Sequence, residues 1–251
     1  MAKIEIPMNN SAGRLYHIID EIKRNNTMGS NPYTVLAKVF NVSKDDKAVI
    51  IENYSELFQL TKTIKEDILQ VTNINHERYL QPINIVLDAL SSIELNGNNG
   101  LNKFVNKIDE NIMTRLEFCS DTLSREIGEH SISEDELNEL CNNVNILIES
   151  VDKMKINDDL KALFLKNLTN IRSAIENYKL WGTKGLQSVI DSSLGSILLR
   201  GDLVTSEEEK GTGKKIVGYI FEIDNIINAG KKIYETLEPV IKFFIGTGKD
   251  E

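Results

Sequence analysis

The fold class is indicated most clearly by residues 43–71, which read SKDDKAVIIENYSELFQLTKTIKEDILQV. Apolar side chains and one threonine recur there at alternating intervals of four and three residues, a heptad spacing that places them on one face of a helix: Ile50, Tyr54, Leu57, Thr61, Ile64, Ile68 and Val71. A helix of roughly 30 residues would be about 45 Å long. We expect it to begin at Ser43, which forms a capping-box pattern with Asp46.

Spacings of three and four residues between apolar positions continue through most of the chain, and the period-two alternation of strands is absent. Capping signals mark the starts of several further helices: Asn10 or Ser11, Asn31 with Pro32, Ser133 with Glu136, and Asn157 or Asp158. We expect Pro82 to bend or end a helix, and a short helix to occupy 186–199. The sequence therefore predicts an all-α protein, a multi-helix bundle with long coiled-coil-like helices.

The chain divides by composition into three parts. Residues 1–200 carry most of the helical patterning and are expected to form a helical bundle body. Residues 201–215 are expected to be a linker, because four charged residues lead directly into a Gly-Thr-Gly sequence with almost no apolar content. Residues 216–251 are expected to form a C-terminal amphipathic helix and a short tail, with Pro239 kinking the last turns.

The C-terminal segment has the most regular heptad spacing in the sequence. Eight of its apolar residues form a candidate interaction surface: Ile216, Ile220, Ile223, Ile227, Tyr234, Leu237, Ile241 and Phe244. Because this apolar stripe follows a linker, it could be buried against the body, a second copy of the chain, a partner protein or a membrane surface. The sequence leaves these four options open.

The composition bounds the class of partner. The 41% hydrophobic content is sufficient for a packed core. The 38 acidic residues against 29 basic ones give a formal net charge of −9. Broad binding along a phosphate backbone needs a cationic face, so we expect no DNA partner.

Three features indicate a cytoplasmic protein. Residues 1–7 contain an acid and a proline where a secretory signal needs an apolar stretch. The sequence contains no run of about 18 uncharged apolar residues, the length that a membrane-spanning helix needs. Cys119 and Cys141 fall within apolar helical patterns, as expected of reduced and buried thiols.

No metal, cofactor or small-molecule site is predicted. Gly-Thr-Gly-Lys occurs at 211–214 and at 246–249, but neither copy has the preceding strand and the following hydroxyl of a phosphate-binding loop. The three histidines lack the spacing of helical metal sites. Paired acids such as Asp158-Asp159 fall in the first turns of helices, where they interact favourably with the helix dipole.

One short motif is typical of catalysis. Arg125 and His130 have an R-x4-H spacing that resembles the motif of HEPN ribonucleases, an all-helical group. The resemblance covers 125–130 and implies that the histidine would act as acid and base at a ribose 2′-hydroxyl while the arginine binds phosphate. Gly128 between them suggests that the helix ends first, so the other reading is a solvated helix end.

The leading hypothesis is a helical protein–protein interaction or assembly protein without catalytic chemistry, which binds a partner protein or a second copy of itself. One alternative is a membrane-surface effector that acts through the C-terminal amphipathic helix, whose lysine pairs suit an interface with anionic lipid. The other alternative is a HEPN-like ribonuclease that uses Arg125 and His130.

Overall fold

The computed structural model describes residues 6–228, which form ten α-helices and one short 3-10 helix and contain no strand. This confirms the all-α prediction. The chain forms two compact units, Met1–Glu129 and His130–Glu251. The division therefore falls at residue 129, inside the part of the chain that we expected to be one body.

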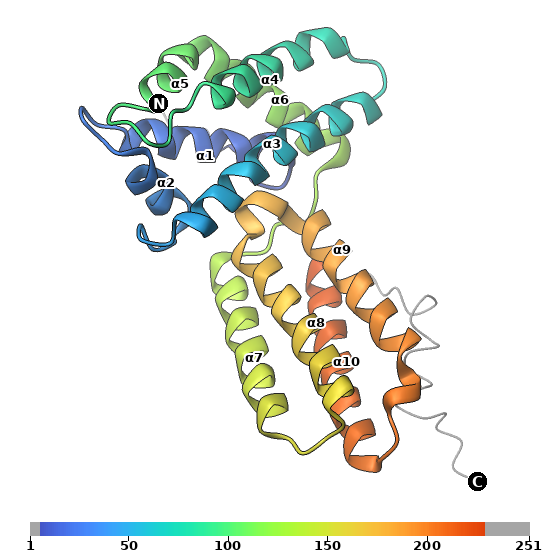
Figure 1. Cartoon of the computed structure of the whole chain (residues 1–251). Helices are drawn as coiled ribbons and strands as arrows, with labels where there is room; N and C mark the ends of the chain where they lie inside the picture. Colours follow the sequence, from blue (N-terminus) through green and yellow to red (C-terminus); the bar gives the residue numbers. More distant parts are fainter. Residues whose placement is uncertain (1–5, 229–251) are drawn as a thin grey trace. The chain divides into compact units, whose positions relative to one another are not determined.

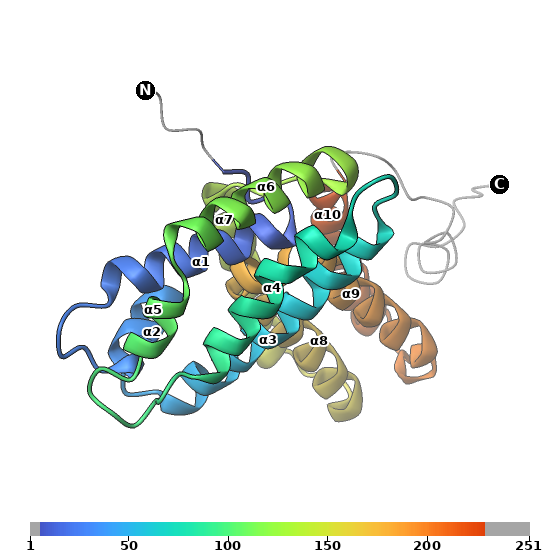
Figure 2. The same cartoon turned by 90° about the horizontal axis from the view of Figure 1, so that it is seen from above.

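Unit 1 contains six helices of unequal length: α1 (Ser11–Asn25), α2 (Pro32–Phe40), α3 (Lys47–Gln70), α4 (His76–Ser91), α5 (Asn102–Lys107) and α6 (Glu110–Ile127). Helix α1 packs against α2, α3 and α6, and α4 packs against α3, α5 and α6. Figure 2 shows α3 and α4 side by side, and α1 running beside α6. The apolar face of α1 is fully buried at the centre of this unit: Leu15, Ile18, Ile19 and Ile22.

The first two helices begin where their capping residues predict. The side chain of Asn10 accepts a hydrogen bond from the backbone N–H of Gly13 at 2.9 Å, and Asn31 caps Tyr33 in the same way. Pro32 occupies the first position of α2, where its missing N–H leaves no helical hydrogen bond unmade.

Helix α3 buries most residues of the predicted stripe but is shorter than expected. It begins after Asp46, whose side chain accepts from Val49, so the cap is Asp46 and not Ser43. It ends at Gln70 and has 24 residues, and α4 begins after Asn75 as a separate helix. Helix α4 also continues through Pro82, which we expected to bend or end a helix.

Unit 2 is a four-helix bundle of α7 (Glu134–Lys153), α8 (Asp158–Glu176), α9 (Tyr178–Leu199) and α10 (Glu207–Ile227), with a 3-10 turn at Gly201–Leu203 (Figure 1). Helix α8 packs against α7 and α9, and α10 packs against α9 and α7. Each helix thus contacts two others, which closes the bundle. Its core takes apolar residues from every helix, including Val144, Phe164, Ile190 and Ile220. The predicted capping box of Ser133 and Glu136 opens α7, and Asn157 caps α8.

The expected linker over 201–215 is not a linker, because α10 starts within it. Ser206 and Glu209 form a second capping box at its N-terminus. The Glu209 carboxylate also accepts hydrogen bonds from the backbone N–H groups of Asn157 and Thr205, at 3.0 and 2.7 Å. These hydrogen bonds lower the pKa of Glu209 to about 2, and the one from Asn157 has the largest effect. One carboxylate thereby joins the starts of α8 and α10.

Helix α9 is longer than the short helix expected at 186–199, and it contains a break at Gly182. That glycine has φ of 64° and ψ of −167°, a backbone conformation that side chains disfavour. Gly182 therefore separates a short helical segment over 178–181 from the longer one over 183–199. Among residues 6–228, no helix is both long enough and apolar enough to cross a membrane.

Candidate functional site

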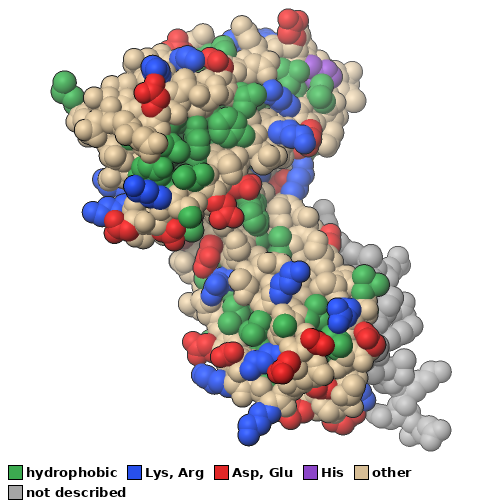
Figure 3. Space-filling model, viewed as in Figure 1, with side chains coloured by type: hydrophobic (Ala, Val, Ile, Leu, Met, Phe, Trp, Pro, Cys, Tyr) green, Lys and Arg blue, Asp and Glu red, His purple; other side chains and the backbone are tan. Residues whose placement is uncertain are grey.

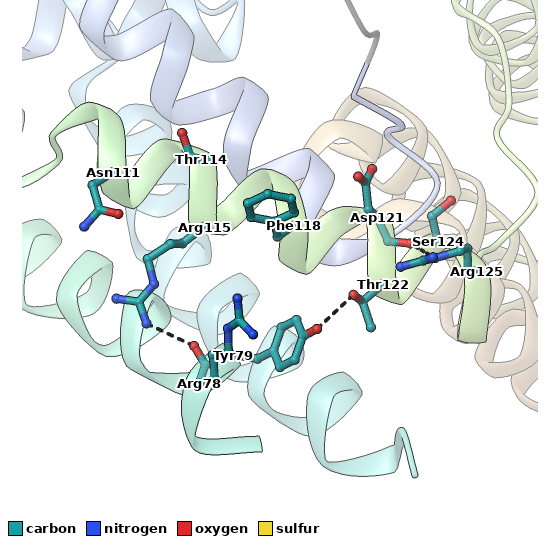
Figure 4. A pocket seen from close by; sticks show the side chains of 10 residues that line it. All are labelled: Arg78, Tyr79, Asn111, Thr114, Arg115, Phe118, Asp121, Thr122, Ser124 and Arg125. Atoms are coloured by element: carbon teal, nitrogen blue, oxygen red, sulfur yellow. Dashed lines mark hydrogen bonds between the residues drawn. The ribbon is translucent and has the colours of Figure 1, made fainter. Parts of the chain in front are cut away.

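Unit 1 has a surface groove between α4 and α6, with a volume of about 700 Å³. Helix α4 contributes Arg78 and Tyr79, and α6 contributes polar residues together with Arg115, Phe118 and Arg125. Figure 4 shows Phe118 near the middle of the α6 side, with Arg115 toward one end and Arg125 toward the other. We call this the α4–α6 groove.

Pro82 determines the chemistry of one end of the groove. Proline has no N–H, so the carbonyl of Arg78, four residues earlier, lacks its helical hydrogen-bond donor. Nη2 of Arg115 donates to that carbonyl oxygen at 3.2 Å and to Oε1 of Gln81 at 2.6 Å. The carbonyl oxygen that Pro82 leaves without a helical donor thus accepts a hydrogen bond from an arginine of α6.

The remaining lining residues of α6 are spaced along one helix face. Phe118 is 58% exposed, which is unusual for a large aromatic side chain. The Thr122 hydroxyl donates to the Tyr79 hydroxyl at 3.3 Å and so links the two walls. Nε of Arg125 donates to the backbone carbonyl of Asp121 at 3.2 Å. The aromatic and cationic groups are therefore presented from two packed helices.

The groove is cationic on a strongly acidic chain. Its lining carries three arginines against one carboxylate, that of Asp121. None of the three arginines forms an ion pair with a described residue, whereas Arg14 and Arg24 of the same unit each do. On the face of unit 2 drawn in Figure 3, acidic and basic side chains are instead interspersed. The lining of the groove thus has a local excess of positive charge.

The first half of the predicted C-terminal stripe is covered by other helices of the chain, which is one of the four options that the sequence left open. Its first four residues, Ile216, Ile220, Ile223 and Ile227, lie in the core of unit 2 with at most 4% exposure. They are buried by their own bundle because α10 packs against α7 and α9. The other four, Tyr234, Leu237, Ile241 and Phe244, lie outside the described residues, as does Pro239.

The two residues of the R-x4-H motif are not brought together on a helix. Arg125 is exposed in the last turn of α6, which ends at Ile127. His130 is exposed beyond the helix end and belongs to unit 2, where its carbonyl accepts from the Thr183 hydroxyl at 2.8 Å. The helix ends before His130, as Gly128 suggested.

The remaining reactive groups have structural surroundings. Burial raises the pKa of Cys119 to about 12 and also raises that of Cys141, so both thiols are protonated at neutral pH. Within residues 6–228, no cluster of three or more His, Cys, Asp or Glu side chains could hold a metal ion. Burial also raises the pKa of Tyr219, whose hydroxyl donates to the carbonyl of Leu140.

No known family matches the chain. A comparison with family models, curated proteins and solved structures found nothing similar to it.

Sequence reasoning missed the α4–α6 groove, although part of the signal was present. Arg115, Phe118, Thr122 and Arg125 follow each other at three- and four-residue intervals along one face of α6. This face adjoins the buried apolar face of α6, which includes Leu116, Cys119 and Leu123. The contribution of α4 was not visible, because nothing in the sequence pairs Arg78 with residues 37 positions away.

Proposed function

We propose that the chain is a helical protein-interaction protein that binds a partner protein through the α4–α6 groove of unit 1. The observation that carries the proposal is the half-exposed ring of Phe118, which lies between arginines that have no ion pair within the described residues. Aromatic residues and arginine are enriched at the energetic centres of protein interfaces. Binding would remove this ring from water, which is the main favourable term in association.

The lining of the groove suits binding better than catalysis. It includes no histidine, cysteine or lysine that could serve as a base or nucleophile. Its one carboxylate, that of Asp121, points away from Tyr79 in Figure 4. The remaining polar groups are hydroxyls, an amide and guanidinium groups, which recognise a ligand by hydrogen bonds and charge.

The heptad stripes support a different part of the proposal. Such spacing favours coiled-coil-like packing between helices. The stripe of α10 over 216–227 is used inside unit 2, so we place the partner contact on unit 1. A contribution from an amphipathic helix over 234–244, in partner binding or self-association, remains part of the interaction hypothesis and lies outside the described residues.

The two alternatives have less support. A membrane-surface effector was argued from an exposed apolar face beginning at Ile216, and the described half of that face is buried. A HEPN-like ribonuclease was argued from Arg125 and His130, which do not share a helix. Neither alternative accounts for the exposed Phe118.

A photo-crosslinking experiment tests the proposal. The full chain, with p-benzoylphenylalanine in place of Phe118, is produced in cells of the organism that encodes it, and these cells are irradiated. A matched protein carries the same group in place of Ile146, which is 65% exposed on α7. We expect discrete adducts with one or a few proteins at position 118 that are absent at position 146.

The same adducts should disappear when Arg115→Gln and Arg125→Gln are added to the protein labelled at position 118. Identical adduct patterns at positions 118 and 146, or adducts that persist in the double variant, would contradict the proposed function. Labelling at position 118 that yields nucleic acid or lipid adducts instead of proteins would also contradict it.

A further inference from the structure

We infer that the α4–α6 groove takes a short acidic segment of a partner protein, with two carboxylate groups flanking one apolar side chain. This inference rests on the proposed function and adds the chemistry of the occupant. It is carried by three observations on the groove: the type of cation present, the way those cations are held, and their spacing about Phe118.

All three groove cations are arginines, although lysine is much the commoner base in this chain, which has only seven arginines. A planar guanidinium group can form two parallel hydrogen bonds to one carboxylate, which an ammonium group cannot do. A groove whose cations are all arginines therefore favours a ligand with carboxylate or phosphate groups, which can form such paired hydrogen bonds.

The arginines are partly oriented before any ligand arrives. One nitrogen of Arg115, Nη2, is held by Gln81 and by the Arg78 carbonyl that Pro82 leaves without a helical donor. Arg125 is held through Nε, so that both of its Nη groups have no partner among residues 6–228. Orientation by neutral acceptors leaves the positive charge available and reduces the side-chain entropy lost on binding.

The spacing of these groups gives the register of the occupant. Ten positions separate Arg115 from Arg125, which is about 15 Å along the axis of α6. An extended peptide covers that distance in about four or five residues. Phe118 lies between the two arginines, so an apolar side chain between two acidic ones would place every group against a complementary partner.

The charge of the surroundings favours a short acidic segment over a nucleic acid. Glu117 and Glu126 lie on the same helix as the groove, and the whole chain carries a net charge of −9. A long polyanion that ran beyond the groove would meet this negative field, whereas a segment of about five residues stays beside the arginines.

A peptide selection tests this inference on the full chain. A phage-displayed library of random twelve-residue peptides is selected in parallel on the wild type, on the Arg115→Gln/Arg125→Gln variant and on Arg200→Gln. The last is the matched control, because Arg200 is an exposed arginine of unit 2. Enriched peptides are then synthesised with a fluorescent label, and their affinities are measured by anisotropy.

We expect peptides enriched on the wild type to carry acidic residues four or five positions apart with an aromatic or aliphatic residue between them. Loss of the two charge-assisted contacts should weaken their binding at least about tenfold in the double variant, and Arg200→Gln should leave it unchanged. Replacing the acids of the peptide by their amides should have a similar effect.

Several outcomes would overturn the inference: no enrichment, enrichment of peptides without acidic residues, or acidic peptides that bind the double variant equally well. Displacement of the peptide by an octauridylate RNA at lower concentration than by unlabelled peptide would assign the groove to nucleic acid. Protein adducts at position 118 together with any of these outcomes would leave the proposed function standing and remove only the acidic segment.

Discussion

The two units use similar helices and differ in how completely those helices cover one another. In unit 2, four helices of 19 to 22 residues close into a bundle, and the heptad stripe of α10 is buried within it. In unit 1, helices of 6 to 24 residues pack unevenly, and α4 and α6 leave a groove in which Phe118 is exposed.

This difference shows that the most regular apolar stripe need not be the interaction surface. A regular stripe is easily matched by the other helices of its own chain and so becomes core. The candidate site lies where regularity fails, at a proline inside α4 and beside an aromatic residue on the polar side of α6. Four substitutions test this comparison between the units.

Of the four test substitutions, the one with the largest expected effect lies in the core of unit 2. Ile220→Ala removes a fully buried side chain and should lower the free energy of unfolding by about 2–5 kcal/mol. Urea unfolding followed by fluorescence of Trp181, the only tryptophan and a residue of unit 2, measures this loss. Leu199→Ala, at an 84% exposed position, is the control and should change little. A loss below about 1 kcal/mol would mean that the stripe of α10 is not core.

Gly13→Ala should destabilise unit 1 by about 1–3 kcal/mol, the range for overpacking. A Cβ at this position would lie 1.8 Å from the backbone oxygen of Pro7. Hydrogen exchange of peptides from α1, followed by mass spectrometry, should show the loss. Gly218→Ala in α10 meets no atom within 4 Å and should stabilise by about 0.5–1 kcal/mol. Effects of the same sign would contradict the structure.

Glu209→Gln should change how unit 2 responds to acid. The pKa of this carboxyl is lowered in the folded state from its usual 4.5 to about 2, so its ionised form stabilises the fold above about pH 4.5. This contribution is lost as the pH falls toward 2. The wild type should therefore melt at a higher temperature than the variant at pH 6, and the gap should close by pH 2. Glu208→Gln, at an exposed neighbouring position, should show no such gap.

The smallest effect on stability is expected at the candidate site itself. Phe118→Ala should change the free energy of unfolding of unit 1 by less than about 0.5 kcal/mol, because the ring is 58% exposed. Phe104→Ala is the buried counterpart in the same unit and should cost about 3–5 kcal/mol. Equal losses in thermal unfolding would indicate that Phe118 is core and would remove the groove as a site.

Much of the helical framework could be predicted because caps and apolar spacing are local. Asn10, Asn31, Ser133 and Asn157 each cap the helix predicted from them. The start of α10 was not predicted, although Ser206 and Glu209 repeat the Ser133–Glu136 pattern, because the glycines that follow them are typical of a linker. Two glycines weaken a helix but do not end one that packs well.

The candidate site could not be predicted in the same way. Pro82 was noticed as a helix breaker, but its consequence for Arg115 depends on α4 lying beside α6. Side chains far apart in the sequence meet only through the packing of the whole unit. The burial of Ile216 and its three companions depends on the same long-range packing, so periodicity alone could not distinguish core from surface.

The two cysteines fall one in each unit, Cys119 on α6 and Cys141 on α7. Cys119 is fully buried, directly beside Phe118 in the sequence, whereas Cys141 is only half-buried. A thiol reagent can therefore reach Cys119 only when unit 1 opens, and its reaction rate reports the frequency of that opening. The reaction rate of Cys119 thus measures the opening of unit 1 alone, and we expect a ligand bound to α6 to lower that rate.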